Sequence, residues 1–137
     1  MSNKTDKKIY QFLNNKKGVK FKMNINVNRV KIIVTVPSDN IKEVRNALFA
    51  HGAGVIGNYT NCSSATKSIG TFKPTSNANP YIGKKDNLEV VNEEKLEVVC
   101  DIKNVKEVIL ALRKVHPYEE PAIDIIPLLD ESFFLNN

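Results

Sequence analysis

The chain has 137 residues, a length that fits one ordinary domain. Its composition, 42% hydrophobic and 26% charged with six Gly and six Pro, excludes a collagen-like, fibrous or wholly disordered protein. No apolar run approaches the ~18 residues of a membrane-spanning helix, and residues 1–22 are lysine-rich without the apolar stretch of a secretory signal. We therefore expect a cytoplasmic protein without a membrane segment.

The net charge of +5 is unevenly distributed along the chain. Residues 1–26 hold seven lysines and one aspartate and so carry +6, whereas the remaining residues carry −1. A domain that binds nucleic acid needs its basic side chains on the folded surface, so this distribution disfavours nucleic acid as a partner. We expect residues 1–27 to form a flexible lysine-rich extension, residues 28–130 the folded domain, and residues 131–137 a C-terminal tail.

The two cysteines, Cys62 and Cys100, are too few for a disulfide scaffold and lack the C-x-x-C spacing of a zinc or redox site. We expect both to be free thiols. The sequence also lacks the P-loop motif, the H-E-x-x-H metal motif and the G-x-S-x-G nucleophile motif. No particular reaction is indicated by the motifs.

The first predicted unit is a strand followed by a helix. Residues 30–36 are rich in β-branched side chains and stop at Pro37, as a buried strand does. Asn40 and Glu43 have the spacing of a capping box, and Gly52 ends the helix. One apolar helical face is formed by Ile41, Val44 and Leu48.

The remaining pattern predicts two more strands, a helix and a last strand. Residues 55–61 are the second strand, residues 63–87 a long polar segment, and residues 88–101 the third strand with a bulge near Asn92. The second helix follows Asn104 and ends at His116, because Pro117 disfavours helical geometry in the residue before it. Its apolar face comprises Val105, Val108, Ile109 and Leu112. Residues 122–128 form the fourth strand.

This order predicts an α+β fold, the ferredoxin-like βαββαβ arrangement, with a four-stranded antiparallel sheet and two helices on one face. The other face then needs a cover. The strands are apolar at many positions, among them Ile33, Val98, Ile123 and Ile125. We therefore expect subunits to associate over the second face of the sheet.

Five short motifs occur in the chain in one order: residues 52–59 (GAGVIGNY), 62–63 (CS), 70–74 (GTFKP), 78–83 (ANPYIG) and 116–122 (HPYEEPA). With them the chain resembles the YqfO-type domain over about residues 28–128. That domain occurs alone or inserted into the larger NGG-interacting-factor-like proteins, and it is similar in fold to CutA and the PII signalling proteins. The resemblance implies the stand-alone form of this insert domain, a homo-oligomer with a trimer favoured, and a binding or regulatory role. The dinuclear metal centre of the larger proteins lies in their flanking core and is not implied here.

The predicted topology selects which polar residues meet. We call the end of the sheet at which the first strand finishes the Pro37 end. Cys62, His116 and the Tyr118–Glu120 segment are expected at this end, together with the Asn79–Tyr81 turn. His51 and Cys100 are expected at the opposite end, which would keep Cys62 and Cys100 from pairing.

This placement gives two sets of candidate site residues. The candidate ligand-binding residues are His116, Tyr118, Glu119, Glu120, Asn79 and Tyr81. The candidate metal ligands are His116, Glu119, Glu120 and Cys62, since imidazole, carboxylate and thiolate groups bind zinc and related divalent ions. A divalent metal is therefore the one cofactor that the sequence suggests.

Simpler interpretations exist for each of these residues. His51 and His116 each end a helix, where an imidazolium would offset the negative end of the helix dipole. The glutamates could pair with Lys or Arg across a subunit boundary, the tyrosines could be core or interface anchors, and Cys62 could be a small buried apolar residue. The Gly52, Gly54 and Gly57 positions indicate a turn rather than a phosphate cradle.

Three functions are compatible with the sequence. The first is an oligomeric binding or regulatory module that senses a small ligand or metal ion without catalysing a reaction, and that contacts a protein partner through residues 63–87. The second is a metal-dependent hydrolase using His116 with Glu119 or Glu120, although a catalytic zinc site usually needs three protein ligands. The third is a purely structural assembly domain.

Overall fold

The computed structural model describes residues 26–135. Residues 1–25 and 136–137, which include almost all of the expected N-terminal extension, lie outside the described residues. The principal elements are β1 (Arg29–Pro37), α2 (Ile41–Ala50), β2 (Ser64–Phe72), β3 (Glu89–Asp101), α3 (Val105–Val115) and β4 (Ile123–Leu128). Short helical turns occur at η1 (Ser38–Asn40), η2 (Ile102–Asn104) and α4 (Ser132–Leu135).

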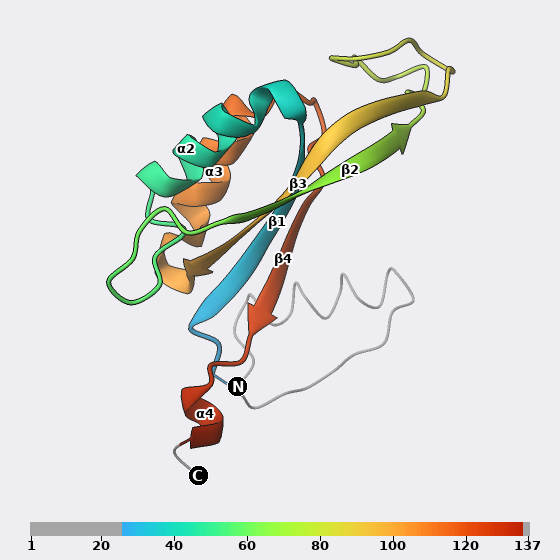
Figure 1. Cartoon of the computed structure of the whole chain (residues 1–137). Helices are drawn as coiled ribbons and strands as arrows, with labels where there is room; N and C mark the ends of the chain where they lie inside the picture. The colour runs from blue at the N-terminus through green and yellow to red at the C-terminus, as the bar shows by residue number, and fades with distance from the viewer. Residues whose placement is uncertain (1–25, 136–137) are drawn as a thin grey trace, which may run out of the picture.

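The strands form one four-stranded antiparallel sheet in the order β2-β3-β1-β4. Figure 1 shows α2 and α3 lying side by side on one face of this sheet. The predicted ferredoxin-like βαββαβ fold is therefore confirmed. Both helices end within a residue or two of their predicted limits, because their apolar periodicity and the Gly and Pro stop signals agree.

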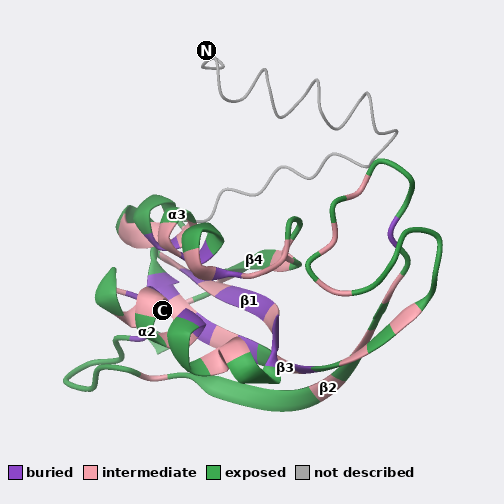
Figure 2. Ribbon diagram, turned by 90° about the horizontal axis from the view of Figure 1, so that it is seen from above, coloured by how far each residue is buried: buried purple, intermediate pink, exposed green. Residues whose placement is uncertain are grey.

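The core lies between the helices and alternate residues of the two central strands. On β1 these are Val30, Ile32, Val34 and Val36, all buried against the helices. They pack in one cluster with Val44 and Leu48 of α2, Val108 and Leu112 of α3, and Leu96, Val98 and Cys100 of β3. In Figure 2 much of β1 is coloured as buried. Each fully buried aliphatic side chain contributes about 1.5–3 kcal/mol of transfer free energy, so this layer is the main stabilising feature of the domain.

The capping box predicted at Asn40 and Glu43 is not formed. Asn40 and Asn104 do precede α2 and α3, but neither makes a side-chain capping hydrogen bond in the described structure. The reason is local geometry: each Asn ends a 3-10 turn with backbone angles in the αR region, at φ −105° and −101°. A capping side chain normally requires extended backbone at that residue.

The second strand is not where the sequence pattern placed it. Residues 55–61 form a small turn with a single bridge between Ile56 and Tyr59, and the strand begins only at Ser64. The Gly54 amide donates to the Val99 carbonyl and the Cys62 amide donates to the Gly54 carbonyl, each at 2.8 Å, so the segment closes into a loop. A Cβ at Gly54 would lie 2.7 Å from the Cys62 carbonyl oxygen.

β3 is a continuous strand of 13 residues, and the predicted bulge near Asn92 is absent from it. Its pairing with β2 runs without interruption from Glu89 to Glu97, with Asn92 opposite Ile69. β1 reaches only as far as Glu93, which pairs with Pro37. The first four residues of β3 therefore pair with β2 alone and form a two-stranded ribbon that extends past the helices (Figure 1).

The connection at the end of this ribbon comprises residues 73–88, because β2 takes up residues 64–72 of the predicted long segment. Figure 2 shows this connection folding back toward the start of β4. Its ends are joined by a 2.6 Å hydrogen bond from the Asp86 amide to the Pro74 carbonyl, and Pro74 is buried. The loop is thus a structured part of the domain.

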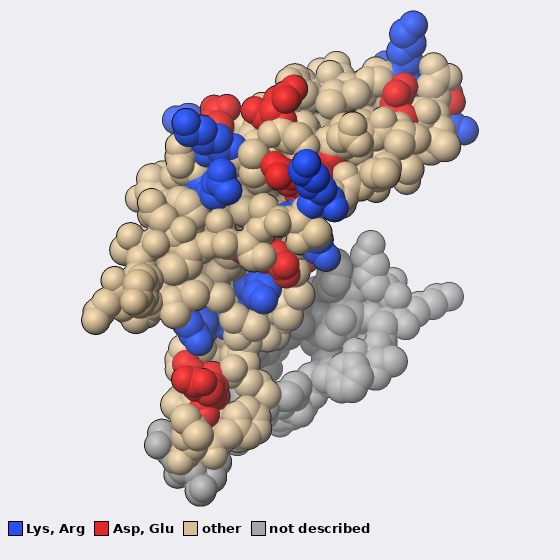
Figure 3. All heavy atoms as spheres, in the orientation of Figure 1, with Lys and Arg blue, Asp and Glu red and all other residues tan. Residues whose placement is uncertain are grey.

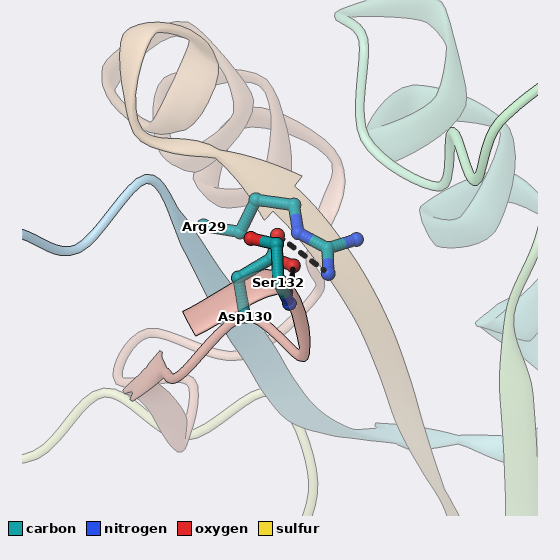
Figure 4. A network of polar contacts seen from close by, with 3 residues as sticks. All are labelled: Arg29, Asp130 and Ser132. Carbon is teal, nitrogen blue, oxygen red and sulfur yellow. Dashed lines mark hydrogen bonds and ion pairs between the residues drawn. The ribbon is translucent and has the colours of Figure 1, made fainter. Parts of the chain in front are cut away.

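The C-terminal residues return to the start of β1. Arg29 pairs with Asp130 at 3.6 Å, and the Ser132 amide donates to Asp130 Oδ1 at 3.0 Å (Figure 4). Hydrogen bonds from Ser132 lower the pKa of Asp130. Part of the predicted tail at 131–137 is therefore the helical turn α4.

Two surface properties complete the description. Within residues 26–135, no helix is long and apolar enough to cross a membrane. Figure 3 shows Lys and Arg side chains interspersed with Asp and Glu over the visible face. Because opposite charges alternate there, their fields largely cancel over that face.

Candidate functional site

His116 is buried at the Pro37 end, where only 6% of its surface is exposed. Its Nε2 lies 2.8 Å from the Thr35 carbonyl oxygen, and its Nδ1 lies 3.1 Å from the Tyr118 amide nitrogen. A carbonyl can only accept and an amide N–H can only donate, so the imidazole is the neutral tautomer with its proton on Nε2. Burial lowers the pKa of His116, against the smaller opposing effect of the hydrogen bond to Thr35.

Tyr118 extends from the segment before β4 across the end of the sheet to β3. Its hydroxyl donates a 2.8 Å hydrogen bond to Glu93 Oε2. Burial, followed by the hydrogen bond and the negative charge of Glu93, raises the pKa of Tyr118 well above its ordinary value. Tyr118 therefore stays a neutral donor, which is what the carboxylate of Glu93, only 7% exposed, requires as a partner.

Glu93 needs a glycine beside it on the neighbouring strand. It lies on the sheet face opposite the helices, paired with Ser68, and its side chain crosses Gly70. A Cβ at Gly70 would overlap the Glu93 Oε1 atom. Gly70 thus gives the Glu93 carboxylate the space in which it receives the Tyr118 hydroxyl.

The long loop is attached to the same segment. The Asn79 amide donates a 2.9 Å hydrogen bond to Glu119 Oε2, which joins residues 40 positions apart. The Tyr118 ring lies 6.2 Å from the ring of Phe72 and 6.4 Å from that of Tyr81, measured between centroids. Loop 73–88, strand β2 and the residues before β4 therefore meet around Tyr118.

These contacts enclose a cavity of about 110 Å³. It is lined by Phe72, Ala78, Pro80, Tyr81, Ile82, Tyr118, Glu119 and Glu120. Tyr81 is 59% exposed, so the cavity is reached from solvent beside this ring. We call it the Tyr118 cavity.

The predicted ligand-binding residues are brought together at the Pro37 end, but with different positions relative to the cavity. Tyr81, Tyr118, Glu119 and Glu120 line it. Asn79 fixes the loop through its backbone amide. His116 lies behind Tyr118, with its ring centroid 5.0 Å away, and supports the wall without lining the cavity. His116 is therefore neutral and structural, so its interpretation as an imidazolium at a helix end is wrong.

Cys62 is not at this end, and its predicted position is wrong. The amide of Cys62 is bonded to Gly54, which is bonded to Val99, and Val99 pairs with Lys31 near the start of β1. The error follows from the misplaced second strand, since residues 55–61 do not climb the sheet. Both cysteines are free, as expected, but they lie toward the same end and not at opposite ends as predicted.

His51 lies at the end opposite the Tyr118 cavity, as expected. Its Nδ1 is 3.0 Å from the Ala47 carbonyl oxygen, and the ring is exposed at the end of α2. The next residue, Gly52, approaches Asn104 at the start of α3. His51 and Glu119 therefore do not meet within one chain.

The described residues contain no group of three or more His, Cys, Asp or Glu side chains arranged to hold a metal ion. Of the four predicted metal ligands, Cys62 is remote and His116 has both ring nitrogens in hydrogen bonds. A metal could bind His116 only after one of these bonds is broken. Glu119 and Glu120 are the two predicted ligands that line the cavity.

Sequence reasoning missed three residues on which this arrangement depends: Phe72, Glu93 and Gly70. Phe72 and Gly70 lie within a motif that the resemblance singles out, but the segment was interpreted as loop, so no side-chain direction followed. Recognising 64–72 as a strand would have placed both residues on one face by the two-residue period. No comparable signal exists for Glu93, which is one of several charged residues in its strand.

The chain is similar in sequence to part of several larger known proteins. No family model matches the chain. It is 46% identical over 102 residues to a GTP cyclohydrolase 1 type 2 homolog of Halalkalibacterium halodurans, covering 74% of this chain and 27% of that protein. It is 48% identical over 104 residues to the homolog of Listeria monocytogenes, covering 75% and 28% respectively. The chain thus spans little more than a quarter of the length of these relatives.

Among solved structures, the chain matches part of one larger protein and most of the length of two CutA proteins. A Bacillus cereus protein related to NIF3 superposes with a TM-score of 0.67 at 35% identity, over 80% of this chain and 28% of that one. CutA1 of Shewanella sp. SIB1 superposes with a TM-score of 0.58 at 15% identity, over 77% of this chain and 86% of that one. CutA of Archaeoglobus fulgidus gives 0.56 at 19% identity, over 79% and 92%. The chain therefore has the fold of the CutA proteins, and it is similar in sequence to little more than a quarter of the NIF3-related protein and of the GTP cyclohydrolase 1 type 2 homologs.

Proposed function

We propose that this domain is an oligomeric module that binds a small ligand in the Tyr118 cavity and acts by binding, without catalysing a reaction itself. The observation that carries the proposal is the cavity, whose walls come from β2, loop 73–88 and the segment before β4. Two hydrogen bonds, Tyr118 to Glu93 and Asn79 to Glu119, hold these walls in place. Such a preformed, aromatic-lined cavity is typical of small-molecule sites.

The same contacts supply a route from binding to regulation. Loop 73–88 forms one wall, and its outer part is exposed at the end of the ribbon. A ligand that contacts both the loop and Tyr118 would favour the docked loop over any undocked form by its difference in affinity for the two. A protein partner that touches the loop would then sense whether the cavity is filled.

The geometry favours binding over metal-dependent hydrolysis. His116, the predicted ligand or base, donates and accepts within the fold and is not free to take a proton from water. A divalent ion held by Glu119 and Glu120 alone would have two protein ligands, fewer than a catalytic site usually uses. Divalent metal ions are therefore only one of the ligand classes to be tested for binding.

We also propose that copies of the chain associate, with a trimer favoured, through the sheet face opposite the helices. On this face the register brings Lys31 beside Val99 and Ile126, and Ile33 beside Glu97. Ile126 is 45% exposed there, and no described helix covers this face. Apolar side chains on an uncovered face of a small sheet are normally buried by another layer, here a second copy.

The binding proposal is tested by ¹H–¹⁵N spectra of the whole chain, recorded with a fixed panel of nucleotides, amino acids, organic cations, Mg²⁺ and Zn²⁺. We expect at least one member to shift backbone amides confined to residues 72–82 and 117–121. The shifts should be lost in Tyr81→Ala and kept in Tyr59→Ala, a matched change of an exposed tyrosine far from the cavity. Shifts spread over other regions, or none from any member, would contradict a binding site here.

A further inference from the structure

The walls of the Tyr118 cavity combine aromatic rings with negative charge. Three of the lining residues are aromatic, namely Phe72, Tyr81 and Tyr118. The Phe72 and Tyr81 rings are each inclined at 53° to the Tyr118 ring, with centroids 6.2 and 6.4 Å from it. Rings inclined to one another can direct more than one ring face toward a common occupant.

The charged groups of the cavity are of one sign. Glu119 and Glu120 line it, and no Lys or Arg is among its lining residues in the described part of the chain. One oxygen of the Glu119 carboxylate accepts the hydrogen bond from the Asn79 amide, which holds this acidic side chain at the wall of the cavity. An anionic group, such as a phosphate, would meet two carboxylates with no cation to offset them.

The hydrogen bond made by Tyr118 strengthens the attraction of its ring for a cation. Its hydroxyl donates to the buried Glu93 carboxylate, which leaves the phenol oxygen and ring more electron-rich. The negative face of such a ring attracts a cation within about 6 Å of its centroid, and the attraction grows when the cation is desolvated.

The size of the cavity limits the cation. The cavity is small, at about 110 Å³, and it is open to solvent on one side. It has room for a small group such as a nitrogen with its methyl groups. A bare inorganic ion would leave most of this apolar volume unfilled and would find only the two carboxylates as strong ligands.

We propose that the ligand of the Tyr118 cavity is a small organic cation that inserts a methylated ammonium group among Phe72, Tyr81 and Tyr118, with Glu119 balancing its charge. This assignment rests on the proposed binding function and names its ligand class. The methyl groups contact the ring faces, and the positive charge is shared between the rings and the carboxylate.

The test is calorimetric titration of the whole chain with choline and with the uncharged analogue in which carbon replaces the nitrogen. We expect choline to bind about tenfold more tightly or better, since cation–π attraction to several rings is lost in the analogue. Tyr81→Leu should weaken choline by about tenfold, whereas Tyr81→Phe should retain most of the affinity because the ring face remains. Tyr59→Leu, far from the cavity, should bind as the parent does.

A second variant separates charge from architecture. Glu119→Gln keeps an oxygen that can accept from the Asn79 amide but removes the negative charge, so it should fold normally and bind choline several-fold more weakly. Equal affinity for choline and the analogue would overturn the cation assignment while leaving a site in the cavity. Choline binding that survives Tyr81→Leu would place the cation elsewhere and overturn it too. Absence of choline binding, with cavity shifts from another panel member, would overturn the ligand class but not the proposed function.

Discussion

The side chain of His116 forms a hydrogen bond with a carbonyl of β1 just beyond the point where β1 and β4 stop pairing. The pairing of β1 with β4 stops at Val34 and Ile123, and Thr35 is the next residue of β1. The Thr35 carbonyl accepts from His116 Nε2, so the imidazole pairs with a backbone group that lies beyond the pairing with β4. The neutral form is required for this, because Nδ1 must remain an acceptor for the Tyr118 amide.

Stability should therefore depend on pH through His116. Because burial lowers its pKa in the folded state, the unfolded chain binds a proton first as the pH falls. The contribution is fully present above the ordinary value of 6.5 and is lost progressively as the pH falls below it toward the lowered value. Urea unfolding between about pH 8 and pH 5 should show this decline.

The matched variants are His116→Gln and His51→Gln. The first should unfold about 1–3 kcal/mol more easily at neutral pH, since a hydrogen bond in a buried site is lost or distorted, and its stability should fall less steeply below pH 6.5. The second, at an exposed helix end, should keep the parent's pH profile. A parent-like slope in His116→Gln would assign the pH dependence to other groups.

Gly70 and Glu93 should be energetically coupled. In Gly70→Ala the new methyl group displaces the Glu93 carboxylate and breaks its hydrogen bond with Tyr118, at a cost of about 1–3 kcal/mol. In a Glu93→Ala background the methyl group has room, so the same change should cost clearly less. Denaturant unfolding of the two single variants and the double variant measures this coupling. Strict additivity would show that the two side chains do not compete for the same space.

Among the elements, loop 73–88 is attached to the segment before β4 by the hydrogen bond from the Asn79 amide to Glu119 and by the contact between the Tyr81 and Tyr118 rings. Glu119→Ala removes the acceptor for the Asn79 amide, and we expect faster hydrogen exchange of loop amides, by about three- to tenfold, with little change in the helices. Glu119→Gln should exchange like the parent, because it retains an acceptor oxygen. Glu120→Ala is the control, since Glu120 makes no hydrogen bond among the described residues. Unchanged exchange in Glu119→Ala would show that the aromatic contacts alone dock the loop.

The elements differ in how far sequence predicts them, for a physical reason. The helices and the central strand were predictable because burial on one side imposes a period on their apolar residues. β2 is an edge strand with mostly exposed Ser, Thr and Lys residues, and it owes its conformation to pairing with β3. The apolar residues of 55–59 suggested a strand, but their exposure shows that no core selects for one there.

The candidate site was predictable only in part for the same reason. The segment from His116 to Glu120 was placed correctly because helix direction and Pro117 fix where it lies. Cys62 was misplaced because its position was derived from a strand that does not form. The roles within the segment could not be predicted, since only the partners Thr35, Glu93 and Asn79, distant in sequence, distinguish a supporting side chain from one that lines the cavity.

At the scale of the whole molecule, the uncovered sheet face should control assembly. Ile126→Glu places a charge on this face, and we expect light scattering to show a shift from a trimer toward the monomer mass, with an unchanged circular dichroism spectrum. Leu110→Glu is the control, because Leu110 is 55% exposed on α3, on the other side of the sheet. A parent chain that is already monomeric at high concentration would contradict the assembly proposal.

The hydrogen bond between His116 and Thr35 joins residues 81 positions apart, and this separation affects the order in which the parts of the domain fold. A pair so distant can close only after the intervening chain has collapsed, because the entropy of closing that loop must be offset by earlier contacts. The Tyr118 cavity should consequently mature at the end of folding, when β1, the ribbon and the last helix have already met. A bound ligand would then raise the melting temperature of the entire domain. An isolated hairpin or fragment would not bind the ligand, because it lacks the complete cavity.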